Sequence, residues 1–316
     1  MNLYEEAEKI SILGLNVYRF GFFVMLGMLG AAAVIGFLSW ARRCRKGTGP
    51  LLLLMSILLG GLCSRAVFCL LNQELGAMMP LASWFRFTGG GWSMMGLVGG
   101  VMLAGFLTGK LTGQKPGLTL DLAACALPLF IALERAGEGS IPEFDYSRRL
   151  TTGLLEGTFL SFSDYDGSYL ATWKLAAILM LIIFLVLVWD MTRSRRDGDT
   201  CLLFLMLFGG CSILLESLRY DRFLSISFVG LQQIFAGVLL AVGVLVPAFQ
   251  AGRRSKKLAL WALVSVAVMV ILAILLEFAL DRTTINKLLI YALYLLVVAV
   301  PVTLGIILRQ RPDRAK

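Results

Sequence analysis

One short stretch of the chain gathers residue types that can bind phosphate and move protons. Glu134, Arg135, Glu138 and Glu143 lie within ten residues and end the apolar run 118–133. An arginine can hold phosphate oxygens in a bidentate manner, and a carboxylate can accept a proton. Ionisable groups near membrane depth are costly, so they persist mainly where they face one another, water or a polar ligand. This stretch is therefore the first candidate for a functional site.

Two further places interrupt apolar runs with charge. Glu216 and Arg219 form a pair three residues apart, and Arg65 stands alone inside another run. We expect these groups and the first stretch to converge on one polar site at the outer end of a helix bundle. The chain has no histidine, which excludes a histidine general base and imidazole metal ligands.

The composition defines the class of protein that must position these groups. Of 316 residues, 58% are hydrophobic and 16% are charged, and the mean hydropathy is +0.82. These values predict an all-α polytopic membrane protein. The six cysteines form no metal-binding pattern, so we interpret them as small apolar side chains. No metal or other cofactor is expected.

Runs of about 17 to 25 apolar residues are long enough to cross the membrane as helices. The predicted spans are 17–40, 50–72, 92–109, 118–134, 170–190, 200–217, 225–249, 258–280 and 287–308. The third run is rich in glycine, which favours a tightly packed central helix. Pro128 interrupts the fourth run.

The distribution of Lys and Arg predicts the orientation. Most of the basic residues fall in alternate connections and in the C-terminal tail, whereas most acidic residues fall on the other side. The positive-inside rule then places the N-terminus outside and the C-terminus in the cytoplasm. The net charge of +9 requires no nucleic-acid partner, because basic loops face anionic lipid. The two long outer connections, 73–91 and 135–169, are predicted to be functional.

Several stretches between residues 17 and 250 match, in order, the motifs of one enzyme family. These stretches are Tyr18-Arg19-Phe20-Gly21 with Ala41-Arg42-Arg43, Gly60-Gly61 with Arg65, residues 89–99, Asp121 to Pro128 leading into Arg135-Ala136-Gly137 and Glu143, residues 203–219 with Glu216 and Arg219, and Ile226-Ser227 with Gly230 and Gln232. The chain resembles a divergent member of the prolipoprotein diacylglyceryl transferase family. Members of this family are bacterial inner-membrane enzymes that transfer a diacylglyceryl group from phosphatidylglycerol to the lipobox cysteine of a prolipoprotein.

The resemblance implies a seven-helix transferase-like core over residues 1–250, followed by two additional transmembrane helices and a basic tail over 251–316. It implies multi-pass insertion in the bacterial inner membrane, with phosphatidylglycerol and the prolipoprotein signal peptide as partners. The resemblance and the chemistry of the transfer together indicate a set of site residues. The catalytic candidates are Arg135, Glu138, Glu143, Glu216 and Arg219, and the substrate-binding candidates are Arg65, Gly137, Gly96, Gly99 and Gln232.

The chain departs from the family pattern at functional positions. Met95 stands where the family has its histidine, and Ser212 stands where it has an arginine. The thiolate is the competent nucleophile, so the transfer calls for a base. Without histidine, a partly buried carboxylate is the remaining candidate, Glu138 first and Glu143 second.

Other interpretations remain open at this stage. Arg135 can simply pair with Glu134 or Glu138, the Glu216 and Arg219 pair can be structural, and Arg65 can extend toward the interface. At the level of function, a closely related phospholipid head-group transfer stays open beside diacylglyceryl transfer. The alternatives are a catalytically altered family member that binds lipid or lipoprotein, and a transporter. A transporter predicts an inverted repeat with broken helices, and the sequence shows no such repeat.

Overall fold

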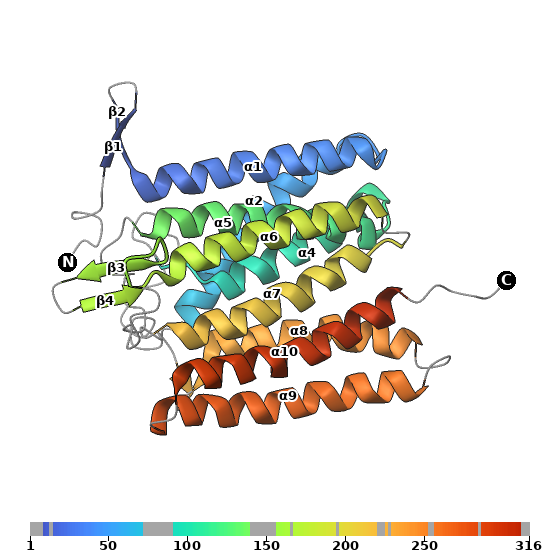
Figure 1. Ribbon diagram of the computed structural model, residues 1–316. Helices are drawn as coiled ribbons and strands as arrows, with labels where there is room; N and C mark the ends of the chain where they lie inside the picture. The colour runs from blue at the N-terminus through green and yellow to red at the C-terminus, as the bar shows by residue number, and fades with distance from the viewer. Residues whose placement is uncertain are drawn as a thin grey trace. The chain divides into compact units, whose positions relative to one another are not determined.

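The protein is built from long apolar helices (Figure 1). The computed structural model describes residues 9–12, 15–71, 91–139, 156–164, 167–193, 196–219, 225–226, 229–251, 256–283 and 286–310. Within these ranges the helices are α1 (Arg19–Ala41), α2 (Thr48–Leu71), α4 (Met94–Thr112), α5 (Pro116–Glu138), α6 (Thr172–Arg193), α7 (Asp199–Leu218), α8 (Leu231–Ala251), α9 (Lys256–Arg282) and α10 (Lys287–Gln310). All nine of these described helices are long and apolar enough to span a membrane. The predicted helical, polytopic class is confirmed.

Three short strand pairs accompany the helices in the described ranges. They are β1 (Lys9–Ile12) with β2 (Leu15–Tyr18), β3 (Ser161–Asp164) with β4 (Gly167–Leu170), and β5 (Ser225–Ile226) with β6 (Val229–Gly230). The last pair corrects one predicted boundary. The seventh span was expected from residue 225, but its helix begins at Leu231 because Ile226 and Val229 pair as antiparallel strand residues. β-branched side chains favour that extended backbone.

Helix α5 runs without a break through Pro128. Proline is tolerated inside a transmembrane helix because neighbouring groups can satisfy the backbone that it frees. The helix starts with Pro116 in its first turn, where the missing N–H costs nothing. Its central face is buried, with Leu122, Cys125 and Ala124 fully shielded. This burial makes α5 the central element of its part of the bundle.

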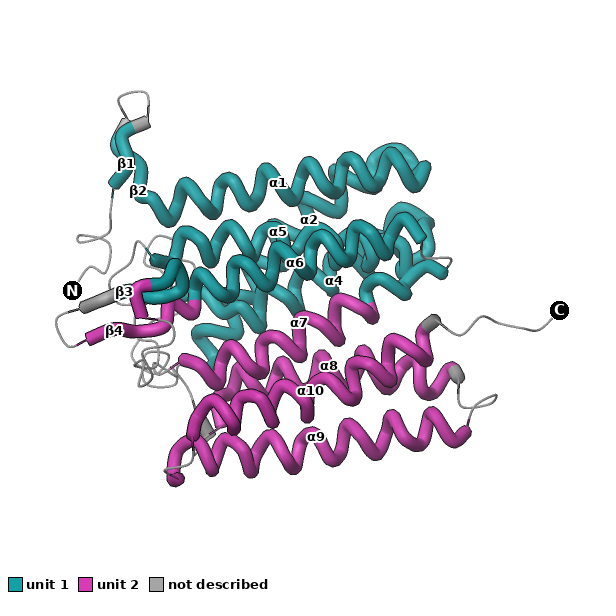
Figure 2. Tube along the Cα trace, in the orientation of Figure 1, with its two compact units in different colours: residues 1–146, 158–162, 173–201 teal, residues 147–157, 163–172, 202–316 magenta. Residues whose placement is uncertain are grey.

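The chain forms two compact units, coloured separately in Figure 2. Unit 1 comprises residues 1–146, 158–162 and 173–201, and unit 2 comprises residues 147–157, 163–172 and 202–316. Helices α1, α2, α4, α5 and nearly all of α6 belong to unit 1, and α8, α9, α10 and most of α7 belong to unit 2. The predicted division of the chain at residue 250, into a transferase-like core and an additional segment, stays a prediction.

Glycines bring α2 and α4 of unit 1 into backbone contact. A Cβ atom on Gly96 would lie 2.6 Å from the Cα of Ser64, and one on Gly100 would lie 2.8 Å from the carbonyl carbon of Leu59. Side chains cannot occupy that space without moving the helix. Ser93 caps the start of α4, and its side-chain oxygen accepts the N–H of Gly96. The predicted role of the third run as a tightly packed helix agrees with this geometry.

A buried carboxylate fixes the start of α7 within unit 1. Both carboxylate oxygens of Asp121 accept backbone N–H groups, from Gly198 and from Cys201, each at 2.7 Å. Asp121 is fully buried. The first N–H groups of a helix have no partner within it, and a carboxylate placed there also complements the helix dipole. Asp121 thus joins α5 to the turn that precedes α7.

Close contacts also organise unit 2. A Cβ on Gly209 of α7 would lie 2.6 Å from the carbonyl oxygen of Ala236 in α8. One on Gly243 of α8 would lie 2.8 Å from the side chain of Met206. Helices α9 and α10 pack on each other and on α8. The last two helices are thereby integral to this unit.

Candidate functional site

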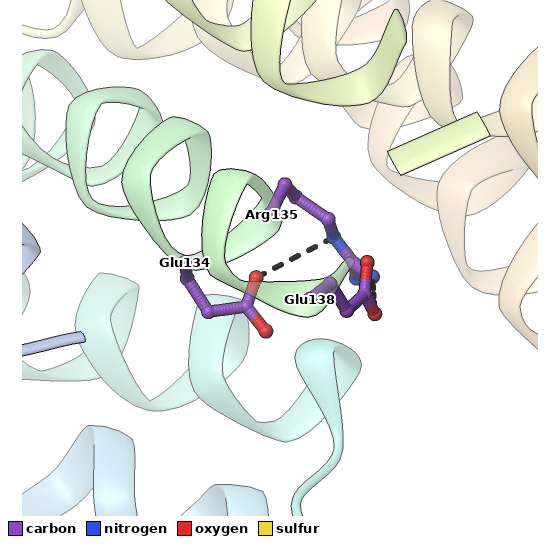
Figure 3. A network of polar contacts seen from close by, with 3 residues as sticks. All are labelled: Glu134, Arg135 and Glu138. Atoms are coloured by element: carbon purple, nitrogen blue, oxygen red, sulfur yellow. Dashed lines mark hydrogen bonds and ion pairs between the residues drawn. The ribbon is translucent and has the colours of Figure 1, made fainter. Parts of the chain in front are cut away.

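The last turn of α5 holds a cluster of three charged side chains (Figure 3). Arg135 donates from one terminal guanidinium nitrogen to Glu138, three residues later. Its Nε lies 3.4 Å from a carboxylate oxygen of Glu134. The side chains of Arg135 and Glu138 are only 14% and 8% exposed. Spacings of three residues place side chains on one helix face, so the sequence itself brings Arg135 and Glu138 together.

Two glycines let neighbouring elements approach this turn. A Cβ on Gly137 would lie 2.8 Å from the Cβ of Phe23, near the start of α1. A Cβ on Gly139 would collide with the indole ring of Trp173, near the start of α6. The Nε1 of Trp173 is buried and has no acceptor among the described residues. Aromatic rings therefore lie close to the charged turn on two sides.

Lys174 lies beside these aromatic rings. Its Nζ lies 4.8 Å from the ring centroid of Phe159 and 5.0 Å from that of Trp173, and it donates to the carbonyl of Phe159 at 3.0 Å. A cation over aromatic faces is held electrostatically.

Arg65 lies buried in α2 and holds the segment that leads into α4. One guanidinium nitrogen donates to the carbonyl of Gly91 at 2.9 Å, and the guanidinium lies 5.6 Å from the ring centroid of Phe68. Beside it, the hydroxyl of Ser64 donates to the carbonyl of Ser93 at 2.8 Å. Gly91 has φ of +78°, a conformation that favours glycine. Arg65 thus organises this connection, and its contact with substrate stays a prediction.

The two glycines predicted to bind substrate differ in their surroundings. Gly96 contacts the backbone of α2 directly. Gly99 is exposed, and no atom of the described residues lies within 4 Å of where its Cβ would be. Packing therefore accounts for Gly96, whereas Gly99 leaves open space on the surface of α4. Their role in substrate binding stays a prediction.

The second charged pair belongs to unit 2. Glu216 and Arg219 are half-buried at the end of α7, and the N–H of Arg219 donates to the carbonyl of Glu216 at 3.3 Å. Gln232 is half-buried in the first turn of α8. Of the described site residues, unit 1 contains Arg65, Gly96, Gly99, Arg135, Gly137 and Glu138, and unit 2 contains Glu216, Arg219 and Gln232. Convergence of the two groups stays a prediction, and Glu143 lies outside the described residues.

Three polar residues with clear structural contacts were not among the predicted site residues. Asp121 joins α5 to α7, as described above. Glu277 and Tyr291 connect the last two helices to α7 and α8. The signal in the sequence was a single carboxylate within an apolar run, at Asp121 and at Glu277. Such a residue indicates a buried contact but does not name its partner.

The arrangement at the end of α5 defines the chemistry open to this protein. A guanidinium offers planar donors suited to a phosphate group, and the adjacent carboxylate can accept a proton. Both stand at the end of a membrane-spanning helix, where a phospholipid head group lies. These features define a polytopic membrane protein with a charged site suited to head-group chemistry.

The comparison with known families identifies the group to which this protein belongs. The family model of prolipoprotein diacylglyceryl transferase matches residues 8–249, most of the chain. The chain therefore belongs to this family of membrane transferases, as the motifs predicted. No individual curated protein matches the chain. The match ends before α9 and α10, which agrees with the two additional helices predicted beyond the family core.

Proposed function

We propose that this protein transfers a diacylglyceryl group from phosphatidylglycerol to the cysteine thiol of a prolipoprotein. The match to the family over residues 8–249 carries the proposal. The charged turn of α5 supports it, because Arg135 and Glu138 lie together within the matched range. The partners are phosphatidylglycerol and the lipobox segment of a prolipoprotein signal peptide. The site faces the outer side of the bacterial inner membrane.

The reaction requires one bond to form as another breaks. The cysteine sulfur attacks the glyceryl carbon that is attached to phosphate, and the carbon–sulfur bond replaces the carbon–oxygen bond. Glycerol phosphate leaves with the bonding electrons, and the thiol proton passes to a base. A free thiol is mostly protonated at neutral pH, so removal of its proton promotes the attack. Charge also grows on the departing phosphate, which a guanidinium can stabilise.

The proposal assigns these two tasks to Arg135 and Glu138. Arg135 would contact the phosphate, and Glu138 would accept the proton. Because the two side chains are paired, the proton acceptor and the cation stand side by side. The low exposure of both strengthens their electrostatic interactions with a bound substrate. Glu143 remains the second candidate for the base.

Glu216, Arg219 and Gln232 are further proposed site residues, and they belong to unit 2. Arg219 would contact a phosphate group, and Glu216 would order the end of α7 beside it. Gln232 and the exposed Gly99 of unit 1 would contact the substrate. Gly96 and Arg65 would act by holding the connection to α4 in place.

The substitution Arg135→Lys tests the proposal in the purified full-length protein. Lysine keeps the charge but loses the planar donors, so transfer to a lipobox peptide should fall about tenfold to a hundredfold, the effect of one hydrogen bond to a charged group. Arg45→Lys is the matched control, since Arg45 donates to the carbonyl of Thr112 at the opposite end of these helices. We expect that control to retain full activity.

Arg135→Lys is a cleaner test than Arg135→Ala. Removal of the guanidinium would leave Glu134 and Glu138 together without it, which costs several kcal/mol when such groups are buried. Equal transfer by Arg135→Lys and the unmodified protein would remove this arginine from the site. Binding of phosphatidylglycerol without any transfer by the unmodified protein would favour the catalytically altered alternative, for which the presence of Met95 is the main argument.

A further inference from the structure

Helices α9 and α10 are joined to the end of unit 2 that carries Glu216, Arg219 and Gln232. Gln233, next to Gln232, is buried at the start of α8. Its side-chain nitrogen donates to Glu277 of α9 at 2.7 Å and to the carbonyl of Ile213 in α7 at 3.3 Å. Its side-chain oxygen accepts the N–H of Gly230 at 3.0 Å. One amide thus connects α7, α9 and the segment leading into α8.

Helix α10 makes a second contact of this kind. The hydroxyl of Tyr291 donates to the carbonyl of Ser217 at 3.1 Å. Ser217 is fully buried and lies between Glu216 and Arg219 in the sequence. The contact therefore acts on the backbone that carries both charged residues.

These contacts are unusual for helices that only face lipid. Glu277 is 2% exposed, within a run of apolar residues. A buried carboxylate is costly unless it is hydrogen-bonded, so an added helix with a merely peripheral role has no need of one. Both contacts also gather at one end of unit 2, where α7 and α9 end and where α8 and α10 begin. Their position links them to the charged pair rather than to general packing.

We propose that α9 and α10 supply positioning residues for phospholipid binding. Glu277 holds Gln233, and thereby Gln232 and Gly230. Tyr291 holds the carbonyl of Ser217, and thereby Glu216 and Arg219. This inference rests on the proposed function, because it assumes that Arg219 and Gln232 contact the phospholipid. It assigns to residues beyond the matched family range a task within the transferase site.

The test compares variants of the full-length protein in transfer from phosphatidylglycerol to a lipobox peptide. Glu277→Leu removes the acceptor and keeps a side chain of similar size. We expect it to raise KM for phosphatidylglycerol about tenfold, the lower limit for loss of one hydrogen bond to a charged group. kcat should change by less than about twofold, because the lost interaction serves binding. Glu277→Gln keeps an oxygen that can accept from Gln233, so its KM should stay within about twofold of the unmodified value.

Tyr291→Phe tests the second contact in the same assay. It removes only the hydroxyl, and the expected rise in KM is about threefold, since a neutral hydrogen bond contributes less. Two matched controls remove hydroxyls whose hydrogen bonds stay within their own helix: Ser265→Ala on α9 and Thr303→Ala on α10. Both controls should leave KM unchanged.

The outcomes separate this inference from the proposed function. Lower stability of Glu277→Leu with unchanged KM would show a purely structural role and overturn the inference. An equal rise in KM for Glu277→Gln and Glu277→Leu would overturn the hydrogen-bond argument. If the unmodified protein transfers nothing, quenching of tryptophan fluorescence by brominated phosphatidylglycerol replaces the assay. Weaker binding in Glu277→Leu and Tyr291→Phe would then support the inference while the proposed function fails, and equal or absent binding would overturn it.

Discussion

Replacement of Asp121 tests how α5 and α7 are held together. Its two oxygens accept the N–H groups of Gly198 and Cys201 inside a fully buried environment. A hydrogen bond to a charged group contributes about 1.5 to 3 kcal/mol. Asp121→Ala should therefore lower the free energy of unfolding by about 3 kcal/mol or more, as two bonds are lost. Buried N–H groups left without an acceptor add to that loss.

Asp121→Asn gives a graded comparison. Its single side-chain oxygen can accept one of the two N–H groups, while its NH₂ group cannot accept the other. The expected loss in unfolding free energy is about half of that for Asp121→Ala. Thr112→Val serves as the control, because the hydroxyl of Thr112 donates to the carbonyl of Thr108 within its own helix.

The assay is unfolding by urea in mild detergent, followed by tryptophan fluorescence. We expect the free energy of unfolding to decrease from the unmodified protein to Asp121→Asn and then to Asp121→Ala. Thr112→Val should be close to the unmodified protein. Asp121 and Arg135 are 14 positions apart on α5, or about 21 Å at 1.5 Å per residue. Asp121→Asn should therefore retain its KM for phosphatidylglycerol if it folds. Equal stability of Asp121→Ala and Thr112→Val would refute the reasoning.

Two further predictions concern the base and the orientation. Glu138→Gln should lower the transfer rate about a hundredfold at neutral pH, the usual size of a general-base effect. The difference in rate from the unmodified protein should become smaller above the thiol pKa of about 8.5, because the thiolate then forms without a base. A difference in rate that stays constant across pH would exclude Glu138 as the base. A cysteine placed in 135–169 should react with an impermeant thiol reagent added outside intact cells, and one placed near Arg254 should not. Labelling of both from outside would contradict the predicted orientation. Burial raises the pKa of the native Cys44 thiol, so at neutral pH it contributes little reactive thiolate to the background.

The membrane spans could be predicted because each depends on local composition. About 20 apolar residues are needed to cross the hydrocarbon core, and a sequence shows such runs directly. The boundary of α8 could not be placed, because apolar content alone does not separate the strand residues Ser225 and Ile226 from the helix that follows. Helix α5 continues through Pro128, as the predicted span 118–134 requires, because neighbouring groups can satisfy the backbone that proline frees.

The candidate site was predictable only where its contacts are local. Arg135 and Glu138 are three residues apart, so helix geometry brings them together. Gln233 and Glu277 are 44 residues apart, and Ser217 and Tyr291 are 74 apart. Contacts of that range depend on which helices pack side by side, and hydropathy carries no information about this. The lone Glu277 in an apolar run indicates a buried contact, but the identity of its partner, Gln233, required the structure.

The glycine contacts between α2 and α4 limit how lipid can reach the interior. At Gly96 and Gly100 the two backbones touch, with no side chain between them that could rotate aside. An acyl chain is several ångströms wide and cannot pass through such a seam unless the helices separate. Lateral entry from the bilayer at this level must therefore use a different gap between helices. At these two glycines the seam between α2 and α4 is therefore a closed part of unit 1.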